Sequence, residues 1–468
     1  MNWAALSVEL AVCGWILVML TADLVLPTKH RGSLWALALL GIACAAWLLA
    51  QQPQISVAMP GMVIVDPFAR YFKGLFLLTV GVVIVMTRTS GRGLPNTGAF
   101  YILLFTALLG TLVLASMRDL LMLFLGLELL TFSLYVMAAY LKTDSRSVEA
   151  GMKYLILGSV SSGFLVYGIA LLYGFAGSTD FSVIRAALDR GPWPLTAQAG
   201  FLLILAGLGF KVGAVPFQLW VPDVYEGAPT PVVALLSVGS KMAGIVAMLR
   251  LLTGVFLPAQ AVWAPLLATI AAATLLYGNL GAIPQTNLKR LLGYSSIGHA
   301  GYLLMALSTG SPSGSAAIGY YLLAYLFSTL AVFLVIVAAS QAVGGDRLDD
   351  YRGLSKRSGF LAAVMFIGLL SLAGVPPLGG FVGKLLVLLA TVESGRLWLV
   401  AVGAVSVAIS LYYYLLVVKR MYLDPPASAA AIPVDGLTKA VLAALVLGIL
   451  AVGIVQQPFL RHIIASLP

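Results

Sequence analysis

The chain is dominated by apolar stretches of about 20 residues or more, the length a helix needs to cross roughly 30 Å of hydrocarbon. Only 9% of its 468 residues are charged and 61% are apolar, whereas about a quarter of a soluble domain is charged. This composition excludes a water-soluble enzyme, a disordered chain and a nucleic-acid-binding protein. We predict an all-α integral membrane protein with about fourteen transmembrane helices. The predicted spans are 3–26, 33–50, 67–87, 98–117, 119–140, 148–174, 197–221, 229–251, 260–284, 288–308, 314–343, 358–391, 396–418 and 437–456.

The net charge of +10 is better explained by loop charge that orients a membrane protein than by a surface that binds a polyanion. Fifteen Lys and Arg residues, Lys29 and Arg92 among them, fall in the odd-numbered connections. The positive-inside rule then places these connections in the cytoplasm and both termini outside. Eight basic residues fall on the opposite side, namely Arg70, Lys73, Arg118, Arg185, Arg190, Arg250, Arg396 and Arg461.

Several ionisable residues lie inside the predicted spans. A lysine at the centre of the hydrocarbon costs at least about 2.5–3.5 kcal/mol, so such residues indicate a function by default. Glu128 lies about 14 Å into its span at 1.5 Å per residue. Glu9 and Asp23 lie nearer the ends of the first span and are more typical of interfacial or packing residues. The candidate set is Glu128, Lys153, Lys211, Lys241, His299 and Lys384.

Each member of this set also has a purely structural interpretation. Lys153 lies near the end of its span, where a long side chain can extend its amine to the interface. Glu128 and Lys211 can form a static ion pair, and His299 can be a packing residue. Four lysines, one glutamate and one histidine spread over six spans are nevertheless better explained as a relay for protons.

The chemistry of a buried amine fits such a relay. Removal from water disfavours the charged form of a lysine, which can then gain and lose a proton near neutral pH. A carboxylate about 7 Å away stabilises the charged form by roughly 2.4 kcal/mol at an effective dielectric constant near 20. Movement of Glu128 relative to Lys211 would therefore change whether the next lysine, Lys241, holds a proton. No redox centre is needed within the chain for this.

Proline residues interrupt two of the spans that carry lysines. Pro216 follows Lys211, and Pro376 with Pro377 precedes Lys384. Proline removes a backbone donor, and the freed groups must be satisfied by protein or water. Interrupted helices beside ionisable residues mark ion paths in transporters, although a simple kink is the structural alternative. The similar contexts of the two breaks predict two five-helix repeats, residues 98–251 and 260–418, flanked by spans in 1–87 and 437–468.

Two stretches closely resemble the antiporter-like subunits of respiratory complex I. They are GFKVGAVPFQLWVPDVYEGAPTPV at 209–232 and QTNLKRLLGYSSIGHAGY at 285–302. The resemblance runs over almost the whole chain and is strongest to the subunit N group of NADH-quinone oxidoreductase. It is supported by the length, the fourteen spans, Tyr-Arg-Gly-Leu at 351–354 and the lysine at Lys384. The related subunit M carries glutamate at that last position, and subunit L is longer.

The resemblance implies two inverted five-helix bundles, each with a half-channel at a broken helix. The chain departs from many relatives at Gln218, where they carry histidine, so a proton role there is not expected. By resemblance, the roles are a coupling pair of Glu128 and Lys211, a central Lys241, an exit-side Lys384, and positions along the hydrophilic axis for Lys153 and His299.

The leading hypothesis is a proton-translocating subunit of a bacterial complex I in the inner membrane, with both termini periplasmic. Its partners would be other membrane subunits, including subunit M and small subunits, together with membrane lipid. The sequence contains no iron–sulfur cysteine run and no dinucleotide fingerprint, and we predict no cofactor or metal in this chain. The resemblance assigns NADH, FMN, iron–sulfur clusters and quinone to partner subunits.

Two other hypotheses are compatible with the sequence. One is a subunit of a multisubunit cation/proton antiporter, which shares this fold and most of these residues. The other is a membrane scaffold whose buried charges only fix the packing of its helices. A complex I relative that takes electrons from a donor other than NADH is also compatible with the sequence.

Overall fold

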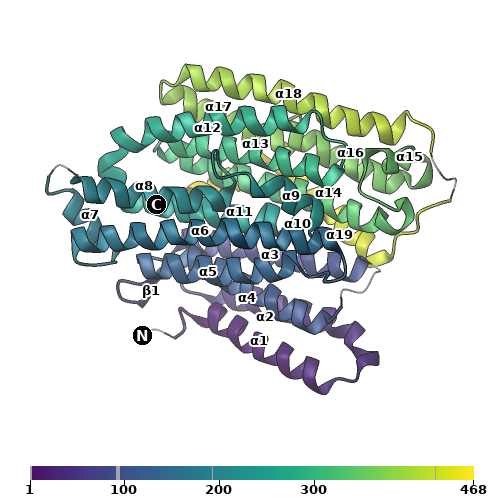
Figure 1. Cartoon of the computed structure of the whole chain (residues 1–468), viewed down its shortest axis with the longest axis horizontal. Coiled ribbons are helices and arrows are strands. Elements are labelled where there is room, and N and C mark those ends of the chain that lie inside the picture. Colours follow the sequence, from purple (N-terminus) through teal and green to yellow (C-terminus); the bar gives the residue numbers. More distant parts are fainter. Residues whose placement is uncertain (1–2, 91–94, 192, 427, 429, 468) are drawn as a thin grey trace.

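The computed structural model describes residues 3–90, 95–191, 193–426, 428 and 430–467. Its helices run side by side in one bundle, with α1 and α18 at opposite edges, and the first and last described residues lie toward the same end (Figure 1). The principal helices are α1 Ser7–Val25, α2 Leu34–Gln51, α3 Pro67–Thr89, α4 Thr97–Ser116, α5 Leu120–Ala138, α6 Ser145–Ala176, α8 Leu195–Val212, α9 Trp220–Gly227, α10 Thr230–Leu235, α11 Lys241–Gly254, α12 Gln260–Ala282, α13 Leu288–Ser308, α14 Pro312–Val343, α16 Gly359–Ala373, α17 Gly379–Glu393, α18 Leu397–Tyr422 and α19 Gly436–Ile454.

Twelve of the described helical segments are long and apolar enough to cross a membrane. All fourteen predicted spans nevertheless have a helical counterpart, so the prediction of a polytopic helical protein is confirmed. Two of them differ from a simple apolar span. The span predicted at 288–308 is α13, which carries Lys289, Arg290 and His299, and the span predicted at 358–391 is divided into α16 and α17.

The ends of the helices are fixed by short polar side chains. Asp66, Asp119 and Asp180 each accept a hydrogen bond from a backbone amide in the first turn of the helix that follows. Asn287 does the same for α13, and Asp435 for α19. The first amides of a helix have no partner within it, and such caps stabilise a helix by about 1 kcal/mol each.

Glycine lets neighbouring helices approach closely at corresponding places in the two halves of the chain. A Cβ on Gly110 of α4 would lie 2.6 Å from the carbonyl oxygen of Gly126 in α5. A Cβ on Gly278 of α12 would lie 2.8 Å from the carbonyl oxygen of Tyr294 in α13. Close backbone contact through small residues is the usual way helices associate in membranes.

A second pair of corresponding contacts involves the helices that precede the breaks. A Cβ on Gly207 of α8 would lie 3.2 Å from the carbonyl oxygen of Ser161 in α6, and a Cβ on Gly368 of α16 would lie 3.3 Å from that of Ser328 in α14. In each half, the long helix therefore packs against the first part of the broken helix through a glycine.

Several short elements lie outside the predicted spans. A β-hairpin joins β1, Ser56–Met59, to β2, Val63–Val65, and α7, Phe181–Leu188, lies near it at one end of the bundle (Figure 1). Short helices α15, Leu354–Arg357, and α20, Gln456–Ser466, lie outside the spans as well, as do 3₁₀ turns at Thr28–Ser33, Leu257–Ala259 and Leu348–Tyr351. None of these short elements was predicted, because the pattern of apolar stretches identifies only segments long enough to cross the membrane.

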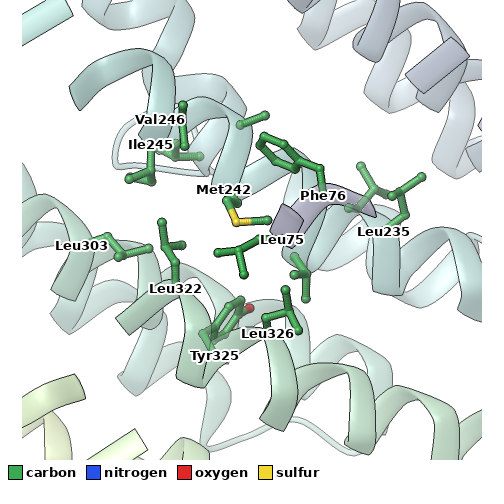
Figure 2. Close-up of a cluster of buried hydrophobic side chains, with 14 of the residues drawn as sticks. Leu75, Phe76, Leu235, Met242, Ile245, Val246, Leu303, Leu322, Tyr325 and Leu326 are labelled. Atoms are coloured by element: carbon green, nitrogen blue, oxygen red, sulfur yellow. The ribbon is translucent and has the colours of Figure 1, made fainter. Parts of the chain in front are cut away.

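The apolar core surrounds the stretch Thr230–Gly254, the most deeply buried of the candidate spans. This span consists of α10, a π-helical turn at Leu236–Ser240 and α11. Side chains from α3, α13 and α14, including Phe76, Leu303 and Leu322, pack together with Met242 of this span (Figure 2). The span that carries Lys241 is therefore enclosed by protein.

One prediction about loop charge is wrong. Lys73 is not in a connection: it lies in α3, its side chain is fully buried, and its amine forms an ion pair of 2.6 Å with Glu9 of α1. The charge count placed it near a span end, where position alone cannot distinguish a loop residue from one that faces a neighbouring helix. Two other counted residues, Arg92 and the side chain of Lys29, lie outside the residues that the structure describes.

Candidate functional site

Lys211 lies where the first broken helix ends. The helix α8 stops at Val212, and Gly213 adopts a left-handed conformation with φ of +74°. The amine of Lys211 donates to the hydroxyl of Thr131 at 2.5 Å and lies 3.5 Å from the hydroxyl of Tyr154. Only 3% of Lys211 is exposed, so its amine is held by neutral hydroxyl groups inside the protein.

Glu128 faces the same small cavity as Lys211. The hydroxyl of Ser162 donates to its carboxylate at 2.6 Å. Among the described residues, Glu128 and Lys211 make no direct ion pair with each other. The cavity between them has a volume of about 20 Å³, which is room for about one water molecule. Glu128 and Lys211 are thus two ionisable groups that line one small cavity without touching each other.

Lys241 lies at the end of the π-helical turn and is 2% exposed. Its amine donates to the hydroxyl of Ser296 at 2.8 Å and also to the backbone carbonyl of the same residue. A Cβ on Gly213 would lie 3.9 Å from the Lys241 amine, which places this lysine beside the first helix break. Such π-helical turns often occur at functional sites.

Lys384 faces the second helix break. The helix α16 ends at Ala373, Gly374 has φ of +88°, and α17 begins at Gly379. The Lys384 amine donates to the carbonyl of Ala373 at 2.8 Å and to the hydroxyl of Ser410 at 3.3 Å. The carbonyls at a helix C-terminus lack partners within the helix and attract cations. Both breaks predicted at Pro216 and at Pro376 with Pro377 are present.

His299 lies between Lys241 and Lys384. Its Nδ1 is 2.6 Å from the hydroxyl of Tyr321, and its Nε2 is 3.2 Å from that of Tyr414. The Tyr414 hydroxyl is also hydrogen-bonded to Ser295, the residue before the partner of Lys241. His299 and Lys384 line one small cavity of about 10 Å³. Both nitrogens of the ring therefore face groups that can donate or accept a proton.

The structure does not bring Lys153 together with the buried amines. Its side chain is 43% exposed and forms ion pairs of 2.7 Å with Glu149 and with Asp223. Arg290 also pairs with Asp223, at 2.6 Å. Partial burial acts to raise the pKa of Asp223, but hydrogen bonds from Lys153 and Arg290 outweigh it and hold the pKa below its usual range. Lys153 thus links α6 to the second part of the first broken helix.

Gln218 is buried close to the first helix break. The residue lies between α8 and α9 and is 4% exposed. Its side-chain oxygen is buried and has no hydrogen-bond partner among the described residues. An amide does not titrate, so the position offers no proton-carrying group.

The hydroxyl groups that connect these ionisable residues were not predicted from the sequence. Each lies on a helix that is otherwise apolar, and a single hydroxyl there is too common to stand out. A cluster of tyrosines within one span, as in Tyr320, Tyr321 and Tyr325, was the available signal. The connecting residues are Thr131, Tyr154, Ser162, Ser295, Ser296, Tyr321, Ser410 and Tyr414.

The fold and the site define a polytopic helical membrane protein with two interrupted helices and buried amines beside both breaks. A sequence model of the family described as NADH:quinone oxidoreductase/Mrp antiporter, TM, matches residues 117–410. The chain belongs to this family.

Curated relatives cover most of the chain. The NADH-quinone oxidoreductase subunit N 2 of Solibacter usitatus is 45% identical over 424 residues, which cover 89% of this chain and 85% of that protein. The subunit N of Desulforamulus reducens is 40% identical over 460 residues, with coverage of 98% and 96%.

Solved structures show the same fold. A chain of respiratory complex I from Thermus thermophilus is 33% identical, with a TM-score of 0.82 and coverage of 97% of this chain and 98% of that one. A chain of the Mrp complex from Dietzia sp. has a TM-score of 0.86 with 21% identity, covering 100% and 97% respectively. At that identity, the second likeness shows the fold alone.

Proposed function

We propose that this chain is the subunit N type of proton-translocating membrane subunit in a bacterial NADH:quinone oxidoreductase. NADH, FMN, iron–sulfur clusters and quinone then belong to partner subunits, and this chain supplies a path for protons. The observation that carries the proposal is the enclosed set of amines, Lys211, Lys241 and Lys384, beside two helix breaks. The identity of 40–45% to relatives named as subunit N favours this function over that of a cation antiporter.

Glu128 and Lys211 are proposed as the coupling pair. They face one cavity with room for about one water, and each is held by neutral hydroxyls rather than by the other. A shift of either helix would change their separation at a small cost in direct contacts. At a separation of about 7 Å, the interaction between the two charged groups is worth roughly 2.4 kcal/mol at an effective dielectric constant near 20. A change of that size alters the electrostatic potential at the Lys241 amine and so its tendency to hold a proton.

Lys241, His299 and Lys384 are proposed as the segment that carries the proton onward. The amine of Lys241 contacts Ser296, and the adjacent Ser295 is joined to His299 through Tyr414. The ring can accept a proton at one nitrogen and release one at the other. Lys384, across the small shared cavity, is the exit-side group.

Lys153 is proposed to lie at the outer end of the hydrophilic axis. Its side chain is 43% exposed and shares Asp223 with Arg290, so it lies between the surface and the segment after the first break. This position suits exchange with bulk water better than storage of a buried proton.

We also propose that residues 98–251 and 260–418 form two inverted repeats, flanked by spans in 1–87 and 437–468. The corresponding contacts of Gly110 with Gly126 and of Gly278 with Tyr294 support these boundaries. Because each repeat contains an odd number of spans, the second repeat crosses the membrane in the opposite direction to the first. We further propose the inner membrane as the location, with both termini periplasmic, because of the loop charge asymmetry.

The experiment is proton pumping by the assembled complex in sealed vesicles, with Glu128→Ala or Lys211→Ala. We expect assembly and NADH oxidation with an uncoupler to persist while pumping falls. Glu393→Ala, which removes an exposed carboxylate from the end of α17, is the matched control. Normal pumping in both Glu128→Ala and Lys211→Ala would leave only the scaffold hypothesis.

Purification separates the remaining alternative. Isolation together with flavin- and iron–sulfur-bearing chains supports the complex I assignment. Sodium-dependent exchange without NADH oxidation would instead support a multisubunit antiporter.

A further inference from the structure

A large cavity lies at the end of the bundle that holds α7 and the β-hairpin. Its volume is about 720 Å³, within the range of small-molecule sites of about 300–1,000 Å³. The wall comes from β2, the ends of α4 and α11, α7 and the start of α14. Arg118, Arg185 and Arg250 reach it from three separate segments. The cavity is distinct from the two small spaces that hold the buried amines.

Arg250 is a fixed part of this wall. It donates to both oxygens of Asp66, at 2.8 Å and 3.0 Å, and its Nε donates to the carbonyl of Ala115 at 2.8 Å. Its guanidinium also lies 4.4 Å from the ring centre of Phe68. This arrangement neutralises most of its charge and orients the side chain without a ligand.

Among the described residues, no carboxylate neutralises the charge of the other two arginines, Arg118 and Arg185. Arg185 donates one hydrogen bond of 3.2 Å to the carbonyl of Gly254, which uses one of its five N–H groups. Arg118 is exposed, and neither arginine makes an ion pair among the described residues. The wall contains two carboxylates, those of Asp66 and Asp189. The wall therefore carries three positive and two negative groups, with both unpaired guanidinium groups facing one space.

Apolar side chains lie next to these charges. Met117, Phe181 and Leu257 contribute to the wall beside the arginines, and Ser315 adds a hydroxyl. A small inorganic anion would use only the polar part of such a site. An anion joined to an apolar body would use both parts.

We propose that this cavity binds a phosphate-bearing anion, with Arg118 and Arg185 as its charged ligands and Arg250 as a fixed positive wall. The planar fork of a guanidinium matches the oxygens of phosphate in two parallel hydrogen bonds. The adjoining apolar wall and the position at the ends of transmembrane helices favour the headgroup of a phospholipid over free phosphate. This site goes beyond the proposed proton path and uses none of its residues.

The test measures lipid binding to the purified membrane complex by native mass spectrometry after removal of loosely bound lipid. Phosphatidylglycerol and phosphatidylcholine are titrated separately, and inorganic phosphate is added as a competitor. Arg118→Gln and Arg185→Gln are compared with Arg190→Gln, which removes an exposed arginine outside the cavity. Each cavity variant should weaken phosphatidylglycerol binding at least roughly tenfold, because even one lost charge-assisted hydrogen bond has an effect of about that size.

The outcomes separate the two sources of phosphate. Phosphatidylglycerol binding that is lost in the two cavity variants, kept in Arg190→Gln and unaffected by inorganic phosphate identifies a lipid headgroup. Direct binding of inorganic phosphate with the same variant pattern identifies a free anion. Equal effects of all three variants, or no preference for phosphatidylglycerol in the unaltered complex, would overturn the proposal. The comparison of the two lipids needs no variant, so the test stands even where a substitution prevents assembly. Arg185→Lys keeps the positive charge and therefore tests the contribution of the planar guanidinium alone.

Discussion

The amine of Lys384 donates a hydrogen bond of 2.8 Å to the carbonyl of Ala373, the last residue of α16. The helix break thus provides the acceptor for the lysine that follows it in sequence. A movement of this break would change the surroundings of the amine directly. This contact joins the backbone of the interrupted helix to the proposed proton path.

Gly374→Ala should impair pumping through this contact. A Cβ there would lie 2.9 Å from Cδ of Lys384, and φ of +88° is unfavourable for alanine by about 1–2 kcal/mol. Gly395→Ala is the control, because Gly395 has φ of +74° with open space around it. We expect both variants to lower the thermal stability of the complex similarly, and only Gly374→Ala to lower protons pumped per NADH oxidised. Equal pumping in the two would contradict the role of this contact.

Lys241→Ala should reduce pumping more than Lys153→Ala. Lys241 is enclosed and contacts the Ser296 segment, whereas Lys153 is 43% exposed. A positioned proton-transfer group contributes typically 10²–10⁴-fold, so we expect at least a roughly tenfold loss for Lys241→Ala and a smaller one for Lys153→Ala. Lys439→Ala removes an exposed lysine and should leave pumping unchanged. The reverse order of the first two variants would remove Lys241 from its central place.

Tyr414→Phe should slow proton transfer between Lys241 and Lys384. The change deletes the hydroxyl that joins Ser295 to His299 and leaves the ring in place. Pumping per NADH should fall several-fold, while NADH oxidation with an uncoupler stays normal. Tyr71→Phe, which deletes a partly buried hydroxyl bonded to the carbonyl of Gly319 and to no ionisable residue of the path, is the control. If both variants pump alike, the path does not use Tyr414.

Lys73→Met should destabilise the protein without a specific effect on pumping. Removal of one partner leaves the charge of Glu9 buried and unpaired, at a cost of about 3–5 kcal/mol. Replacing both residues, as in Glu9→Leu with Lys73→Met, should restore much of that loss. Thermal unfolding of the single and double variants measures this coupling. Additive losses would show that the pair does not act as a unit.

Acidification should weaken the contact between α3 and α19 through Asp435. Burial acts to raise its pKa, but Thr438 and Arg88 lower the pKa to about 2, from an ordinary value of 3.8. The charged form is favoured in the folded state, so the stabilisation is complete above about pH 4 and is lost as the pH falls toward 2. Asp435→Asn should remove this part of the pH dependence of the unfolding temperature. An unchanged profile would contradict the assignment.

The sequence was sufficient for the helical spans, both helix breaks and the burial of three lysines. Each follows from a strong local rule, since apolar length, proline and a buried charge are visible without tertiary contacts. Lys73 was misplaced because its burial depends on its contact with Glu9 of α1, a residue far from it in the sequence. The links through Tyr414 and Ser296 could not be predicted either, since they depend on how α11, α13 and α18 meet.

The most direct test of the whole account is infrared difference spectroscopy of the assembled complex with isotopically labelled lysine, compared before and during NADH oxidation. The account predicts a lysine signal that changes protonation state during turnover and is lost in Lys241→Ala. A lysine spectrum that stays the same throughout turnover, in a complex that still pumps, would contradict it.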